Sequence, residues 1–72
     1  MKRYFEYKDE KSSKFWEIFH DINKVIVRYG KIGSTGQTLE KKMASAGEAK
    51  KEYDKLVLEK TKKGYTELIQ NR

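Results

Sequence analysis

The spacing of apolar residues changes once along the chain, and the change divides it into two parts. In the first 43 positions, apolar and aromatic residues come in short runs bounded by charged or glycine-containing turns, which is typical of strands. These runs predict strands over residues 4–7, 15–19, 24–29 and 37–43. The last run alternates only weakly, so we expect that strand at an edge of the sheet.

A helical period replaces the strand pattern after residue 44. Residues 45–48 (Ser-Ala-Gly-Glu) form a capping box, which predicts the start of a helix. The apolar positions that follow fall on one helical stripe, and they are Ala49, Tyr53, Leu56 and Val57. Gly64 is a natural end for this helix, and residues 65–69 could add a short final strand. The pattern predicts one α+β domain over residues 1–72, with an antiparallel sheet of four or five strands and one helix packed on a face.

Length and composition narrow the classes of function. The 72 residues contain no cysteine and one histidine, His20, which excludes disulfides, zinc–thiolate sites and thiol catalysis. The acids are scattered and a chain of this length can bury only a small core, so we expect no enzyme, no cofactor and no metal site. No apolar run is long enough for a signal peptide or a membrane span. We therefore expect a cytoplasmic chain without membrane contact, and a monomer by default.

The charge of the chain points to negatively charged partners. Seventeen basic and 11 acidic residues give a net charge of +6. Such an excess favours polyanions, nucleic acid above all, although many lysine-rich domains are merely soluble. Charge alone leaves these two interpretations open.

The most informative stretch is residues 25–38, where a β-branched run ends in Arg28, Tyr29, Gly30 and Lys31. An aromatic ring and a cation on either side of a glycine suit an anionic ligand with a flat group. The glycines that follow, at positions 33 and 36, lack the order of a phosphate loop, so we expect them to supply positive φ angles for a tight reversal. In a regular strand Arg28 and Tyr29 point to opposite faces, so both can touch one ligand only where the strand twists or ends.

The aromatic residues and the remaining lysines each allow two interpretations. Tyr29 can stack on a base or sugar, but from the residues alone a place in the core is favoured. The single tryptophan, Trp16, is likewise assigned to the core. Lys41 and Lys42 either line one basic surface with the lysines at 50 and 51 or form a solvated face.

Four segments of the chain resemble the WGR domain in order and spacing. They are residues 14–18 (Lys-Phe-Trp-Glu-Ile), 27–33 (Val-Arg-Tyr-Gly-Lys-Ile-Gly), 36–38 (Gly-Gln-Thr) and 59–65 (Glu-Lys-Thr-Lys-Lys-Gly-Tyr). The resemblance covers nearly the whole chain and implies an antiparallel sheet with one helix against it. WGR domains of DNA-dependent poly(ADP-ribose) polymerases bind broken DNA near a 5′ end and help relay that binding to a catalytic domain. Similar domains occur in bacterial proteins of poorly defined role.

The resemblance also assigns roles to residues. The Trp-Gly-Arg triplet that names the family corresponds to Tyr29, Gly30 and Lys31, and Ser13 stands where the polymerases tend to have asparagine. The resemblance implies that Tyr29 packs on a terminal nucleotide and that Ser13 helps to hold the backbone. Tyrosine offers a smaller ring than tryptophan, and lysine lacks the bidentate fork of arginine.

We therefore predict a nucleic-acid-binding module that contacts backbone and strand ends without reading bases, with DNA favoured over RNA. The predicted contact residues are Ser13, Lys14, Arg28, Tyr29, Gly30, Lys31, Lys41 and Lys42. Tyr29 would stack, Lys31 and Ser13 would hold phosphate, and Gly30 would permit close approach. The alternative is a protein–protein adaptor that docks a partner on its sheet, with the basic charge incidental.

Overall fold

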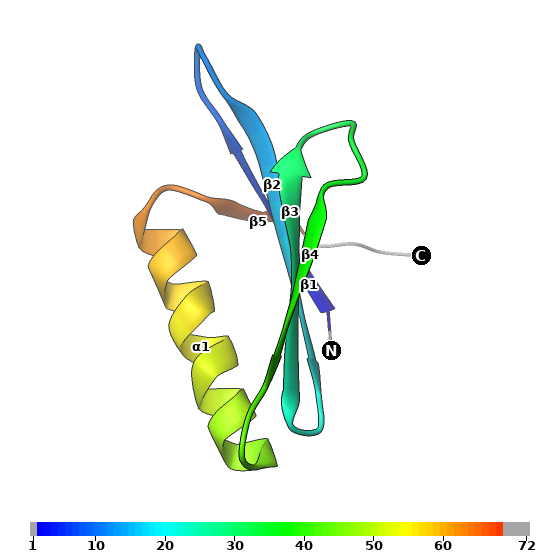
Figure 1. Ribbon diagram of the computed structural model, residues 1–72. Helices are drawn as coiled ribbons and strands as arrows, with labels where there is room; N and C mark the ends of the chain where they lie inside the picture. The colour runs from blue at the N-terminus through cyan, green and yellow to red at the C-terminus, as the bar shows by residue number, and fades with distance from the viewer. Residues whose placement is uncertain (1, 69–72) are drawn as a thin grey trace.

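The computed structural model describes residues 2–68, and in this range one helix covers one face of a five-stranded antiparallel sheet (Figure 1). In chain order the elements are β1 (Lys2–Lys8), β2 (Ser13–Asp21), β3 (Lys24–Lys31), β4 (Gln37–Lys42), α1 (Ala46–Lys62) and β5 (Thr66–Leu68). The strands lie in the order β4-β3-β2-β1-β5, and every neighbouring pair is antiparallel. The predicted α+β class and the edge position of β4 are confirmed. The predicted final strand is present, although its expected end at Ile69 lies outside the described residues.

The helix begins and ends at the expected residues. The Ser45 Oγ accepts a hydrogen bond from the Glu48 backbone N–H at 3.2 Å, which satisfies one of the free donors at the start of α1. Gly64 follows the C-cap residue with a φ of +103°, a conformation that favours glycine. Between these ends Ala49 and Tyr53 are buried against the sheet, so the predicted stripe is confirmed.

Strand alternation gives the sheet two different faces. The helix-side face supplies the main core, in which Phe5, Trp16, Ile18, Val25 and Val27 pack with the helix. Trp16 is only 3% exposed, so its assignment to the core is confirmed. The other face, which we call the open face, has no helix over it (Figure 1).

The open face has a small apolar centre of its own at Phe15. This side chain is 3% exposed because the ring of Tyr4 stacks on it, with 6.0 Å between ring centroids. The guanidinium of Arg28 lies 4.7 Å from the centroid of the Phe15 ring. The Tyr4 ring and the Arg28 guanidinium therefore cover Phe15 on the open face, as the helix covers Trp16 on the other face.

Glycines allow the β3–β4 loop to fold back on the strands. Gly33 and Gly36 have φ values of +98° and +75°, so the predicted positive φ angles are confirmed. A Cβ at Gly36 would lie 2.5 Å from the Tyr29 carbonyl oxygen and 2.7 Å from the Phe15 ring. A Cβ at Gly30 would lie 2.8 Å from the Gly36 Cα. The space beside Gly30 is thus filled by the protein's own loop.

Candidate nucleic-acid interface

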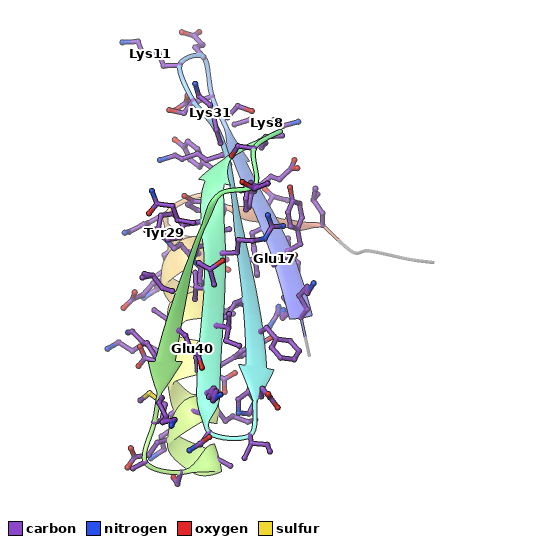
Figure 2. All side chains as sticks on the ribbon, turned by 45° about the vertical axis from the view of Figure 1, so that its right-hand side comes forward. Lys8, Lys11, Glu17, Tyr29, Lys31 and Glu40 are labelled. Atoms are coloured by element: carbon purple, nitrogen blue, oxygen red, sulfur yellow. The ribbon has the colours of Figure 1, made fainter. Side chains whose placement is uncertain are left out.

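The two faces of the sheet divide the predicted contact residues into two groups. Lys14, Tyr29, Lys31 and Lys41 belong to the helix-side face, whereas Ser13, Arg28, Gly30 and Lys42 belong to the open face. The register of β2 and β3 pairs Lys14 with Lys31 and Trp16 with Tyr29, so these four residues share one face. In Figure 2 Tyr29 and Glu17 lie on opposite sides of the sheet. The structure therefore brings Tyr29 and Lys31 together and separates them from Ser13 and Arg28.

Two helix lysines join the strand lysines at one end of the molecule. Lys14, Lys60 and Lys63 line a cleft of about 420 Å³ between the β1–β2 turn and the end of α1. Lys31 lies beside Lys14 across the β2–β3 pair. Tyr7, Asp9, Ser12 and Tyr65 complete the lining. We call Lys14, Lys31, Lys60 and Lys63 the lysine cluster.

Aromatic rings lie under the ammonium groups of two members of the lysine cluster, Lys14 and Lys60. The Lys60 Nζ is 5.5 Å from the ring centroid of Trp16 and 5.2 Å from that of Tyr65. The Lys14 Nζ is 5.4 Å from the centroid of Tyr7, and the rings of Tyr7 and Tyr65 are 5.4 Å apart. Such placement attracts each ammonium group to the negative face of a ring without neutralising its charge.

The positive charge of the lysine cluster is largely uncompensated by carboxylates. Within residues 2–68, no member of the cluster forms an ion pair with a carboxylate. Burial, together with the positive charges of Lys63 and Lys14, lowers the pKa of Lys60. A group whose charged form is disfavoured in this way gains when an anion arrives.

Asp9 is the acidic residue that lines this cleft, and its oxygens are used within the β1–β2 turn. Its carboxylate accepts hydrogen bonds from the backbone N–H groups of Lys11 and Ser12 at 2.9 and 2.6 Å. The Tyr7 hydroxyl donates a third bond at 3.0 Å. These bonds, that of Lys11 above all, lower the pKa of Asp9. Asp9 therefore shapes the turn and offsets the lysine charge only in part.

A second cleft adjoins the first between α1 and the strands β3 and β4. It has a volume of about 300 Å³, and we call it the aromatic cleft. Its lining is Trp16, Val27, Tyr29, Leu39, Lys41, Leu56, Lys60 and Tyr65. Lys60 and Tyr65 line both clefts, so the two clefts are direct neighbours.

Tyr29 takes both of the positions that its sequence context allowed. Its half-buried ring packs against the core and also lines the aromatic cleft. Its hydroxyl donates a hydrogen bond to the Gln37 Oε1 at 3.2 Å. The ring is therefore held in a fixed orientation at the edge of the cleft.

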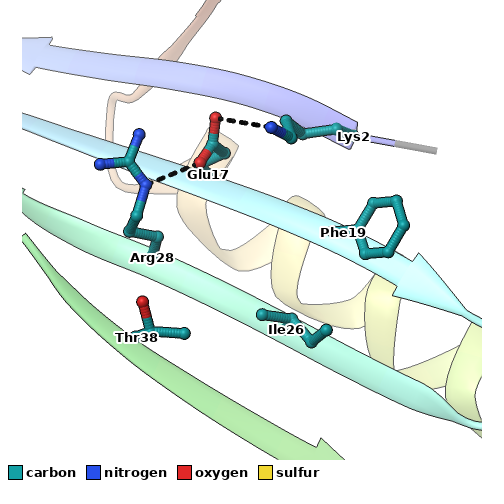
Figure 3. Close-up of a pocket in the computed structure, with 6 residues that line it drawn as sticks. All are labelled: Lys2, Glu17, Phe19, Ile26, Arg28 and Thr38. Carbon is teal, nitrogen blue, oxygen red and sulfur yellow. Dashed lines mark hydrogen bonds and ion pairs between the residues drawn. The ribbon is translucent and has the colours of Figure 1, made fainter.

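Arg28 is engaged by its own protein on the open face. Its Nε donates to the Glu17 Oε1 at 2.9 Å, and its Nη1 donates to the Thr35 carbonyl oxygen at 2.7 Å. Lys2 lies 3.8 Å from the same carboxylate (Figure 3). A cleft of about 490 Å³ on this face is lined by Lys2, Glu17, Phe19, Ile26, Arg28 and Thr38. In this group one carboxylate offsets part of the charge of two cations, whereas the lysine cluster has no such internal partner among residues 2–68.

The other predicted residues lie apart from the lysine cluster or have internal contacts. The Lys41 ammonium donates to the Glu52 carboxylate at 2.7 Å, and Lys41 also belongs to the lining of the aromatic cleft. Ser13 is exposed on the open face, and its carbonyl oxygen accepts from the Ile32 N–H at 3.1 Å. Lys42 is exposed at the end of the edge strand β4.

Sequence reasoning did not assign a binding role to Tyr7, Lys60, Lys63 or Tyr65. The lysines after residue 59 fit the negative end of the helix dipole, which is a sufficient local explanation for them. A signal was present, because three of these residues fall in the segment 59–65 that carries the family resemblance.

Residues 2–68 include no helix with the length and apolar character needed to cross a bilayer. They also contain no group of three or more histidine or acidic side chains arranged to hold a metal ion.

This chain is similar to one part of several longer known proteins. It is 45% identical over 67 residues to the uncharacterized protein YfeS and 43% identical over 65 residues to the protein YehF, both of Escherichia coli strain K12. These matches cover 93% and 90% of this chain but only 28% and 24% of the relatives. The chain also matches the crystal structure of a Bacteroides fragilis protein with a TM-score of 0.94 and 55% identity, over 96% of this chain and 20% of that one.

The model of the WGR domain family matches residues 1–72, the whole chain. The match agrees with the four segments that suggested the resemblance and with the observed sheet and helix. The chain therefore belongs to the WGR domain family, a type of domain associated in general with nucleic-acid binding.

Proposed function

We propose that this chain binds DNA through the phosphate backbone at strand ends, with the lysine cluster as its contact surface. The observation that carries the proposal is the gathering of Lys14, Lys31, Lys60 and Lys63 without carboxylate partners among the described residues. Assembling like charges is unfavourable for the free protein, and a polyanion relieves that repulsion.

The rings beside the lysine cluster favour an end or an unpaired stretch over the middle of a duplex. Tyr7, Tyr29 and Tyr65 are half-buried, so each presents part of a ring to solvent. Bases and sugars are accessible to such rings where stacking is interrupted, which is the case at an end. Contacts to phosphate and sugar carry little sequence information, so we expect binding with weak sequence preference.

The salt dependence of binding tests the proposal. If the four lysines neutralise four phosphates, the logarithm of the association constant falls with the logarithm of salt concentration with a slope of about −3.6. Fluorescence anisotropy of a labelled duplex with a 5′-phosphate, measured at several salt concentrations, gives this slope. A matched RNA duplex in the same titration measures the preference for DNA.

A matched pair of double variants assigns the slope to a surface. Lys14→Gln with Lys63→Gln removes two charges from the lysine cluster, and Lys24→Gln with Lys42→Gln removes two from the open face. The first variant should have a slope of about −1.8, and the second should keep nearly the full slope. Equal slopes for the two variants would contradict the assignment. Binding that is absent, or indifferent to salt, would favour the protein–protein adaptor.

A further inference from the structure

We propose that the edge strand β4 pairs with β4 of a second copy of this chain, so that two five-stranded sheets join into one. Backbone hydrogen bonds and a contact between the two copies of Leu39 hold the partner. The default expectation from the sequence is a monomer, and this inference replaces it. The inference does not depend on DNA binding.

The outer edge of β4 offers backbone groups for pairing. The order of strands ends at β4, so within residues 2–68 no other strand lies beyond it (Figure 1). The Met43 N–H donates to the carbonyl oxygen of Asn23, which the register places opposite, at 2.7 Å. The backbone groups of Met43 therefore face β3, and by the alternation of an antiparallel pair those of Thr38, Glu40 and Lys42 face outward.

β4 lacks the features that usually keep an edge strand from pairing. Its six residues follow the β3 register without a bulge and include no proline, whereas the opposite edge strand, β5, has only three residues. Two of the charges on β4 are paired inside the protein. Glu40 lies 3.2 Å from Lys24. The Lys41 ammonium donates to the Glu52 carboxylate at 2.7 Å, so the middle of β4 carries little net charge.

The sequence of β4 favours one register for pairing with itself. A two-fold axis perpendicular to the joined sheet must pass through a residue, because residues directly opposite each other lie on the same face. Two such registers pair five residues of each strand, one centred on Leu39 and the other on Glu40. The second sets Glu40 against Glu40, which is unfavourable. The first sets Glu40 against Thr38 and Lys41 against Gln37, and so avoids like charges.

The register centred on Leu39 also buries an exposed apolar side chain. Leu39 is 55% exposed, and its backbone groups face β3. It therefore meets its copy in a non-hydrogen-bonded pair, where Cα atoms are about 4.5 Å apart and side chains are closest. On either side of the axis Thr38 of one copy and Glu40 of the other exchange backbone hydrogen bonds. The same axis places the two lysine clusters on one side of the joined sheet.

Sedimentation velocity of this chain without DNA tests the inference. The interface is one strand wide, so we expect a weak dimer with a dissociation constant of about 10 μM to 1 mM. Each copy has a net charge of +6, so association should strengthen as salt rises, which is opposite to the expected effect of salt on DNA binding. A sedimentation coefficient that stays at the monomer value up to about 1 mM protein at high salt would overturn the inference.

Two variants at Leu39 test the register. Leu39→Lys and Leu39→Glu each place like charges across the axis, so each alone should remain monomeric. A mixture of the two places opposite charges there and should form dimers. Leu58 is also 55% exposed but lies on α1, so Leu58→Lys and Leu58→Glu are matched controls that should each associate as the native chain does.

The results with these variants decide the register. A Leu39 mixture that associates no more than either variant alone would overturn the inference. Equal loss of association in the Leu58 variants would also overturn it, because that loss would follow net charge and not position.

The outcomes separate this inference from the proposed function. A chain that stays monomeric and still binds DNA with the expected salt dependence would overturn the dimer alone. A chain that dimerises and binds no DNA would overturn the proposed function alone.

Discussion

Both faces of the sheet carry cations, but the two faces differ in how these cations are paired with carboxylates. On the open face Arg28 and Lys2 share the Glu17 carboxylate, and Lys24 lies 3.2 Å from Glu40. On the helix-side face the four members of the lysine cluster lack such partners among the described residues. Cations are therefore paired with a carboxylate in the group around Glu17 and unpaired in the lysine cluster, within the described residues.

The alternation of side chains along one strand, β2, contributes to both faces. In β2, Lys14 and Trp16 point to the helix-side face, whereas Phe15 and Glu17 point to the open face. A shift of one residue in the register would move Lys14 to the open face and Glu17 to the helix-side face, and so lower the charge excess of the lysine cluster. The net charge of +6 is therefore less informative than the register that distributes it.

The loop between β3 and β4 lies close to the Phe15 ring and to the backbone of β3. A substitution in this loop should have the largest effect on stability. In Gly36→Ala the new Cβ would meet the Tyr29 carbonyl oxygen at 2.5 Å and the Phe15 ring at 2.7 Å, at a φ of +75°. We expect a loss of about 3 kcal/mol or more in the free energy of unfolding, from strain and overpacking together. Urea denaturation followed by Trp16 fluorescence measures the loss.

Gly33→Ala is the matched control for this loop. Gly33 also has a positive φ, +98°, but a Cβ there would meet no atom within 4 Å. Its loss should therefore be limited to the backbone cost, about 1 kcal/mol. Equal losses for the two variants would show that the contact with Phe15 and β3 does not hold the loop.

Arg28→Met should destabilise the open face by a smaller amount. It removes the hydrogen bond to Glu17 and leaves a carboxylate that is only 12% exposed without its closest partner. Loss of a bond to such a charged group costs about 1.5–3 kcal/mol. Lys2→Met is the control, because Lys2 is more exposed and lies 3.8 Å from Glu17, so its removal should cost less than about 1 kcal/mol. If Arg28→Met instead reduced DNA affinity as much as the loss of two cluster lysines, the contrast between the faces would fail.

Much of the fold could be predicted from sequence because its signals are local. The strand runs, the cap at Ser45 and the stop at Gly64 each depend on a few neighbouring residues. The opposite directions of Arg28 and Tyr29 were also predictable, since they follow from the period of a strand.

The residues that form the site were harder to predict from the sequence, because their grouping depends on distances between residues that are far apart in the chain. Lys14 and Lys60 meet only after α1 has crossed β2 and β3, and no local pattern reports that crossing. The engagement of Arg28 by Glu17 likewise requires the β2–β3 register. The strand predicted to end at residue 29 continues to Lys31, and the candidate residues 28–31 are therefore divided between the two faces.

Lys60→Met should have the smallest effect on stability, and with a sign opposite to that of Arg28→Met. The substitution removes a charge that burial and Lys63 and Lys14 disfavour, while a thioether keeps contact with the rings of Trp16 and Tyr65. Relief of repulsion from Lys63 amounts to about 0.2–0.5 kcal/mol, so the free energy of unfolding should rise slightly at neutral pH. DNA affinity should fall in the same variant.

The pH dependence of that gain separates charge from packing. The pKa of Lys60 is lower in the folded protein than in the unfolded chain. At a pH between these two pKa values the unfolded chain therefore binds more protons, and the stability of the native sequence rises as pH rises through the folded pKa. The advantage of Lys60→Met should therefore shrink at alkaline pH, where Lys60 is neutral in the native protein. Urea denaturation of both proteins at neutral and alkaline pH measures this difference. A variant that is less stable than the native protein at neutral pH would show that Lys60 is part of the scaffold, as Arg28 is, and would remove the distinction between the two faces.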